Sequence, residues 1–120
     1  MAESKREIPL YTAGGMQVAC KAVNACKDRE SAYKVRLATL AKIRSYVTAN
    51  VGFVDFYQGS KVRLVVLPEY FLSGFMLGES HEAWHHKACI EQNGPEYEFL
   101  GKLAQDTNIF LAGNVYEIDP

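Results

Sequence analysis

Glu69 is the residue of this sequence best placed to do chemistry, because it follows an apolar run that ends in proline. Residues 64–67 are apolar without a break, and Pro68 stops the run, a pattern typical of a short strand buried on both faces. In open α/β sheets, ligands bind beyond the carboxyl ends of the strands. A glutamate placed there beside aromatic side chains would be partly desolvated, which raises its pKa toward that of a general base. The alternative is a solvated loop glutamate, since most exposed acids take no part in chemistry.

A second candidate is the segment His81-Glu82-Ala83-Trp84-His85, which matches H-E-x-x-H. On a helix the two histidines share one face and can hold zinc, with the glutamate as a base. The residues on either side of the segment predict a solvated turn instead, and no third ligand is marked, although Glu91, Glu96 and Glu98 are nearby in the sequence. We therefore favour exposed histidines on a lid-like helix with Trp84 as its packing anchor, and expect no metal.

The three cysteines are weaker candidates. Cys20 falls on a presumed core strand, where a cysteine is usually a small inert hydrophobe. Cys26 has no histidine near it in the sequence, and Cys89 follows the histidine cluster. A nucleophilic role for any of them is disfavoured. Tyr116 and Glu117 follow an expected third strand, so they either line the same pocket as Glu69 or are ordinary loop residues.

The elements that must position Glu69 alternate between strand and helix. We expect a strand over 16–23 and then a helix capped by Asp28, whose apolar stripe is Tyr33, Leu37, Leu40, Val47 and Val51, with Ala41 and Ile43 alongside. Arg36 falls mostly off this stripe. Residues 52–59 form an uncertain connector before the strand over 62–67. Strands joined by a helix at this spacing predict a parallel sheet.

The second half of the chain continues the alternation. An aromatic loop over 70–79 precedes a short polar helix that begins at Glu79 or Ser80 and ends near 88. Gly94-Pro95 marks another helix start, with proline at the first helical position. Asn108 is a plausible C-cap of that helix, and 109–115 reads as a third strand. A sheet built from these units would have exposed edges and one poorly covered face.

Composition excludes several classes of protein. The chain has 120 residues, of which 48% are hydrophobic and 22% charged, as in an ordinary globular domain. We expect residues 1–15 to be a loose lead and residues 16–120 to form the domain. A net charge of −1 argues against nucleic acid or an anionic membrane as partner. An odd number of cysteines, no signal peptide and no membrane-length apolar stretch predict a cytoplasmic protein.

Two stretches resemble a known family. "LVVLPEYFLSGF" resembles the first motif of the nitrilase superfamily, the carbon–nitrogen hydrolases that cleave amides, carbamoyl amines and nitriles. "GPEYEFLGKLAQDTNIFLAGNVYEIDP" is similar to the family's Gly-Pro-Glu helix and the strand after it, and "MQVACKAV" resembles its first strand less specifically. The resemblance covers roughly residues 16–120.

The resemblance implies an α/β fold, namely the amino-terminal portion of an α-β-β-α sandwich that is incomplete as given. It also implies that Glu69 is the general base of a Glu-Lys-Cys triad, with Tyr70, Phe71 and Phe75 walling the substrate. The family's lysine and cysteine come from motifs further along, so we expect this chain alone to be inactive. No metal or organic cofactor is implied, the substrate would be a small amide or nitrile, and the complete protein would form homo-oligomers. The alternatives are a zinc peptidase or a truncated, non-catalytic domain.

Overall fold

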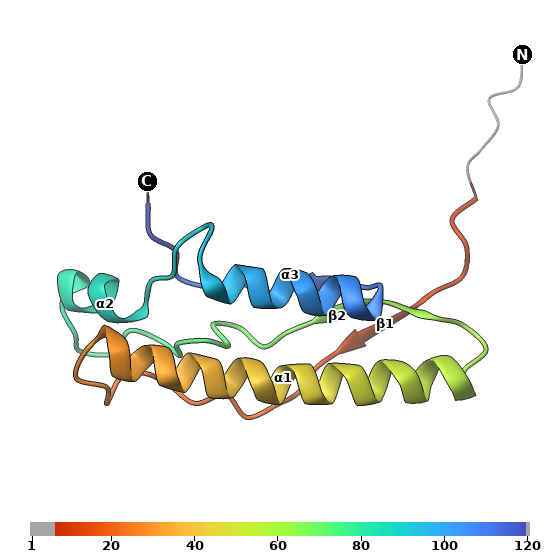
Figure 1. Ribbon diagram of the computed structural model, residues 1–120, viewed down its shortest axis with the longest axis horizontal. Coiled ribbons are helices and arrows are strands. Elements are labelled where there is room, and N and C mark those ends of the chain that lie inside the picture. The colour runs from red at the N-terminus through yellow and green to blue at the C-terminus, as the bar shows by residue number, and fades with distance from the viewer. Residues whose placement is uncertain (1–6, 120) are drawn as a thin grey trace, which may run out of the picture.

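A long helix, α1 (Arg29–Tyr57), spans most of the structure (Figure 1). The computed structural model describes residues 7–119 of the chain. Asp28 caps α1 as predicted, because its Oδ1 accepts a hydrogen bond of 2.8 Å from the Ser31 backbone N–H, and the Ser31 hydroxyl in turn accepts one from the Asp28 backbone N–H. The helix continues through Gly52 to Tyr57, so the predicted connector is wrong for residues 52–57. A single interior glycine costs only about 1 kcal/mol relative to alanine, which a long packed helix tolerates.

One face of α1 is buried, and it differs in part from the predicted stripe. Leu40, Ile43, Val47 and Val51 are buried as predicted, whereas Leu37 is 39% exposed. Arg36, which we expected mostly off this face, is only 1% exposed. The sequence pattern misses it because an arginine is buried only where a partner neutralises its charge.

The sheet has three strands, β1 (Thr12–Gly15), β2 (Val62–Val66) and β3 (Phe110–Ala112), in the order β1-β2-β3. Both pairings are parallel, as predicted. The first strand lies earlier than the expected 16–23. Met16 still donates a backbone hydrogen bond of 2.8 Å to Val66, but β2 ends there, so the residues after Met16 have no ladder to join. Residues 12–15 are therefore not part of a loose lead, and residues 1–6 lie outside the described part.

Within residues 7–119, helices cover only one face of the sheet. The register pairs Val65 with Leu111 on the face toward the helices, and Val65 is buried. It pairs Leu64 with Phe110 on the opposite face, where Phe110 is 76% exposed and Val66 is 44% exposed. The prediction that β2 is buried on both faces is therefore wrong, and the prediction of one poorly covered sheet face is confirmed.

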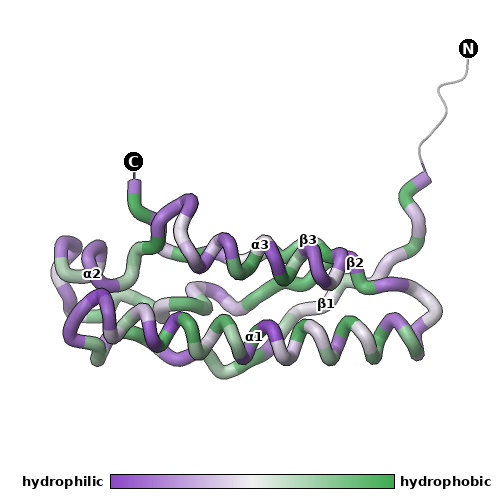
Figure 2. Tube along the Cα trace, in the orientation of Figure 1, coloured by the Kyte–Doolittle hydropathy of each residue, from purple (hydrophilic) through white to green (hydrophobic). Residues whose placement is uncertain are grey.

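The remaining helices are α2 (His81–Ala88) and α3 (Pro95–Thr107), and α3 packs beside α1 (Figure 1). The Ser80 hydroxyl caps α2 by accepting from the Ala83 N–H at 3.1 Å, and Pro95 begins α3 as predicted. Asn108 ends α3 in the left-handed conformation, with φ of 54°. Figure 2 shows α2 as a mostly hydrophilic helix, in agreement with the polar helix that the sequence predicts.

Residues 7–119 thus form a mixed α/β unit with one parallel sheet and helices packed on one of its faces. The α-β-β-α sandwich is not present within these residues, because they contain no second sheet.

The radius of gyration is 17.2 Å, against about 13.6 Å for a compact domain of this length. The accessible surface is 8462 Å², against about 6,500 Å² for a compact monomer of this mass. None of the helices in the described range has both the length and the apolar composition to cross a membrane.

Candidate active site at the carboxyl edge of the sheet

Glu69 lies where the sequence predicts it, just past the carboxyl end of the central strand β2. The pairing with β3 extends one residue beyond the strand, since the Leu67 N–H donates to the Ala112 carbonyl at 2.8 Å. The chain then turns sharply, and the Ser73 and Gly74 backbone N–H groups both donate to the Tyr70 carbonyl. The Glu69 side chain is exposed. The expected partial burial of this carboxylate is therefore wrong for residues 7–119, because the neighbouring aromatic rings do not cover it.

Four aromatic side chains meet in one group that includes Tyr70, the residue after Glu69, and we call them the aromatic cluster: Tyr70, Phe75, Trp84 and Tyr116. The Tyr70 ring stacks on Tyr116 with ring centroids 4.4 Å apart and an interplanar angle of 15°. Phe75 meets Tyr70 edge-on at 5.1 Å, and Trp84 meets Tyr116 edge-on at 5.5 Å. Two effects raise the pKa of the Tyr70 phenol, first the electrostatic interaction with the Tyr116 phenol and second desolvation. The stack of Tyr70 on Tyr116 thus joins the loop after β2 to the segment after β3.

The backbone at Tyr70 has an unusual conformation. Its φ is 47°, in the left-handed region that residues with a Cβ rarely adopt. Its N–H donates a hydrogen bond of 2.8 Å to the side-chain oxygen of Asn114, which follows β3. Sequence reasoning missed Asn114, and the only signal was its position two residues past the strand. Tyr116, by contrast, lies at the Glu69 edge as the parallel sheet predicts.

Phe71 lies apart from the other aromatic residues of this loop. It is 2% exposed and packs in the main core, whereas Phe75 is 50% exposed. Gly113 leaves room for the Phe71 ring, because a Cβ at Gly113 would lie 3.0 Å from it. Phe71 therefore supports the loop from the core and does not face the exposed side of the sheet edge.

Glu117 takes part in a hydrogen-bond network with α3 and the loop before it. One carboxylate oxygen accepts from the Gln92 amide at 2.7 Å, and the other accepts from the Tyr97 hydroxyl at 2.5 Å. The Tyr97 bond is the main cause that lowers the pKa of Glu117. Burial is the main cause, and this same bond the second cause, that raises the pKa of Tyr97 to about 12. Glu117 is thus held toward α3, while its neighbour Tyr116 joins the aromatic cluster.

The helix α2 presents its histidines to solvent. His81 and His85 are exposed, and no group of three side chains that could ligate a metal occurs among residues 7–119. Trp84 anchors the helix as predicted, at 3% exposure. Lys87 was expected in a solvated turn but is buried, because its ammonium pairs with Glu79 at 2.7 Å and donates to the Asn24 carbonyl at 2.9 Å. No observation in this region favours a zinc peptidase.

The three cysteines are free thiols that occupy half-buried or buried positions. Burial raises the pKa of both Cys20 and Cys89. A raised thiol pKa lowers the thiolate fraction at neutral pH, and the thiolate is the nucleophilic form. These environments suit inert side chains.

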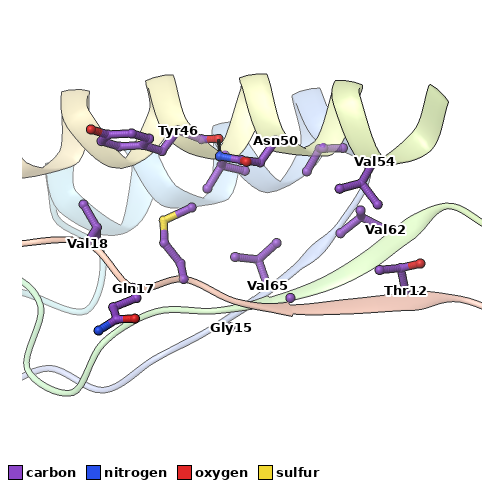
Figure 3. A pocket seen from close by; sticks show the side chains of 13 residues that line it. Thr12, Gly15, Gln17, Val18, Tyr46, Asn50, Val54, Val62 and Val65 are labelled. Carbon is purple, nitrogen blue, oxygen red and sulfur yellow. Dashed lines mark hydrogen bonds between the residues drawn. The ribbon is translucent and has the colours of Figure 1, made fainter. Parts of the chain in front are cut away.

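A separate cleft of about 320 Å³ lies between α1 and the β1–β2 side of the sheet (Figure 3). Its walls are mostly apolar, with Val62 and Val65 from β2 and Val54 from α1, and polar groups from Tyr46 and Asn50. Glu69 and the aromatic cluster do not line it. The cleft carries no acid, base or thiol side chain suited to catalysis, so the sheet edge remains the candidate site.

A parallel α/β unit with a carboxylate beyond its central strand defines a class of proteins that bind or transform ligands at that edge. A comparison of the sequence with models of known protein families identifies one family within this class. The sequence model of the family described as carbon-nitrogen hydrolase matches residues 33–119, more than half of the chain. The protein therefore belongs to the carbon–nitrogen hydrolase family. No curated protein and no solved structure matches the chain.

Proposed function

We propose that the protein contributes the general base, Glu69, to the hydrolysis of a non-peptide amide, carbamoyl amine or nitrile. The observation that carries this proposal is the position of Glu69, directly beyond the central strand of the sheet and within the range that matches the family. An exposed carboxylate at this edge is accessible to a substrate and to a thiol from outside the described residues.

In the mechanism that the family resemblance implies, a cysteine thiolate attacks the carbon of the substrate. With an amide or carbamoyl amine, Glu69 takes the thiol proton, delivers it to the leaving amine and then activates the water that releases the acyl group. With a nitrile, the proton goes to the nitrile nitrogen, and Glu69 then activates two waters in turn, the first releasing ammonia and the second the acyl group. A lysine stabilises the tetrahedral oxyanion. Cys20, Cys26 and Cys89 do not occupy the family's nucleophile context, so we assign the thiol and the lysine to motifs outside these 120 residues. No metal or organic cofactor takes part.

The aromatic cluster supports a role in substrate binding. Tyr70 follows Glu69 in the chain and its ring meets that of Phe75, so the exposed parts of these two side chains are available to wall a small substrate. Phe71 supports this wall from the core rather than touching the substrate.

We also expect homo-oligomers, which size-exclusion chromatography with light scattering would detect.

The test uses the protein with an affinity tag at residue 1, isolated from its own cells so that any further sequence or partner is retained. Ammonia release is measured with short amides, N-carbamoyl amines and nitriles. Glu69→Gln keeps the size and one acceptor oxygen but cannot take a proton. It should lower kcat by roughly a hundred- to ten-thousand-fold, the usual contribution of a positioned general base.

Glu98→Gln is the matched control, because Glu98 is an exposed acid in the first turn of α3. Glu96, the acid two positions earlier, is unsuitable because it is 3% exposed and ion-paired. Near-normal kcat in Glu69→Gln, or equal losses in Glu69→Gln and Glu98→Gln, would contradict the proposal. Clear turnover by residues 1–120 alone, blocked by a thiol reagent, would move the nucleophile to one of the three cysteines in this chain.

A further inference from the structure

The turn that carries Glu69 is held from the end of the neighbouring strand. Asn114, two residues past β3, accepts the Tyr70 N–H with its side-chain oxygen at 2.8 Å. Two residues earlier, the Ala112 carbonyl accepts the Leu67 N–H at the same distance. The Asn114 side chain thus continues the β2–β3 ladder beyond the point where backbone pairing stops.

This contact acts on Glu69 through a single peptide plane. The Tyr70 N–H belongs to the peptide group that also contains the Glu69 carbonyl, and a peptide group is planar. Fixing the direction of that N–H fixes ψ of Glu69 and so the direction in which its side chain leaves the backbone. The carboxylate itself has no hydrogen-bond partner among the described residues that could orient it otherwise.

The conformation of Tyr70 shows that the turn needs such a restraint. At φ of 47°, a residue with a Cβ is in a disfavoured region, and such a conformation persists only where the surroundings impose it. Two contacts from the segment after β3 do so, the Asn114 hydrogen bond and the stack of Tyr116 on the Tyr70 ring. Strained residues of this kind gather at active sites, where strain maintains a geometry that the relaxed chain would lose.

We propose that Asn114 is a positioning residue for Glu69, holding the Glu69–Tyr70 peptide so that the carboxylate points at the reacting thiol. This inference rests on the proposed function of Glu69. Asn114 acts through the backbone of the turn, because its side-chain oxygen accepts the Tyr70 N–H. A carboxylate displaced by about 1 Å can lose roughly a hundredfold in rate, so the effect should appear in kcat rather than in KM.

The first arm of the test measures the turn itself, by NMR on the 120-residue chain. In Asn114→Ala the Tyr70 amide should exchange with solvent at least tenfold faster, while the Leu67 amide, held by Ala112, keeps its protection. Asn114→Asp retains the acceptor oxygen and should restore protection of the Tyr70 amide. An unchanged Tyr70 exchange rate in Asn114→Ala would overturn the inference. If Asn114→Ala fails to fold, Asn114→Leu, which keeps the side-chain size but lacks the acceptor oxygen, makes the same comparison of the Tyr70 and Leu67 amides.

The second arm measures catalysis in the tagged protein isolated from its own cells. Asn114→Ala should lower kcat by about a hundredfold with KM within twofold. Asn114→Asp should recover most of that loss, and Asn93→Ala, an exposed loop asparagine, should have no effect. Normal kcat in Asn114→Ala beside an inactive Glu69→Gln would overturn the positioning role alone. Normal kcat in Glu69→Gln would instead overturn the proposed function, and with it the catalytic meaning of Asn114.

Discussion

The Arg36 Nε lies 2.8 Å from the Glu96 Oε1, and both side chains are almost completely buried, at 1% and 3% exposure. The same guanidinium donates a second hydrogen bond of 2.9 Å to the Lys87 carbonyl. Arg36 belongs to α1, Lys87 to α2 and Glu96 to α3, so one arginine joins all three helices. The pair fixes the helical layer against which the sheet and the candidate site are built.

Glu96→Gln should destabilise the protein severely. The substitution leaves the Arg36 charge buried without a counter-ion, and breaking a buried pair from one side costs about 3–5 kcal/mol. Urea denaturation followed by circular dichroism measures the loss as a lower midpoint. Glu98→Gln, an exposed neighbour on the same helix, should change the free energy of unfolding by less than about 0.5 kcal/mol. Equal effects of the two substitutions would show that the buried pair has no special role.

Trp84→Ala should detach α2 from the rest of the molecule. The indole is 3% exposed and packs with Val23, Ala32 and Ala88, so its removal should cost about 3–5 kcal/mol of unfolding free energy. The indole N–H has no hydrogen-bond partner among residues 7–119, so Trp84→Phe removes a donor that is unpaired within this range and should cost much less than alanine. The midpoints of thermal unfolding should fall in the order unaltered protein, Trp84→Phe, Trp84→Ala. A midpoint of Trp84→Phe as low as that of Trp84→Ala would contradict this account.

The Tyr97–Glu117 hydrogen bond should make stability depend on pH at both extremes. Because folding raises the pKa of Tyr97 from 10.0 to about 12, its contribution is complete below pH 10 and is lost as the pH rises toward 12. Because folding lowers the pKa of Glu117 below 4.5, the contribution of that carboxylate is present above pH 4.5 and is lost on further acidification.

The Tyr97→Phe substitution tests the pH dependence of stability at both the alkaline and the acid extreme. It should remove the last-titrating tyrosine from the absorbance titration at 295 nm and shift the midpoint of acid unfolding to higher pH. Tyr46→Phe is the matched control, because Tyr46 is half exposed on α1 and its hydroxyl makes no hydrogen bond within the described residues. If the tyrosine that Tyr97→Phe removes titrates near 10.0, and the acid midpoint does not move, the bond to Glu117 is absent in solution.

His81 and His85 should not hold zinc. Both are exposed on α2, and no third side chain that could complete a ligand set lies near them in the described range. Elemental analysis after dialysis should give zinc far below one equivalent, and His81→Ala should not change that content. Near-stoichiometric zinc that disappears in His81→Ala would restore the peptidase alternative.

The sequence alone determined the elements whose signals are local. The helix ends are predicted correctly by the capping residues Asp28, Ser80 and Asn108 and by Pro95, because caps and proline act through backbone groups only a few residues away. The apolar run before Pro68 located the central strand and so placed Glu69 at the carboxyl edge of the sheet. The motif around Glu69 also indicated the family that residues 33–119 match.

Only the tertiary structure decided which distant residues meet. The first strand lies at 12–15 rather than 16–23, because its extent is set by where β2 offers a partner and not by its own alternation. Arg36 and Glu96 are 60 residues apart in the chain, and nothing in either local sequence announces that their charges neutralise each other in the core. The contact of Asn114 with the Tyr70 amide likewise exists only because the parallel pairing of β2 and β3 ends both strands at the same edge. Caps and periodicity are short-range, whereas ion pairs, strand ends and the Asn114–Tyr70 hydrogen bond depend on long-range packing.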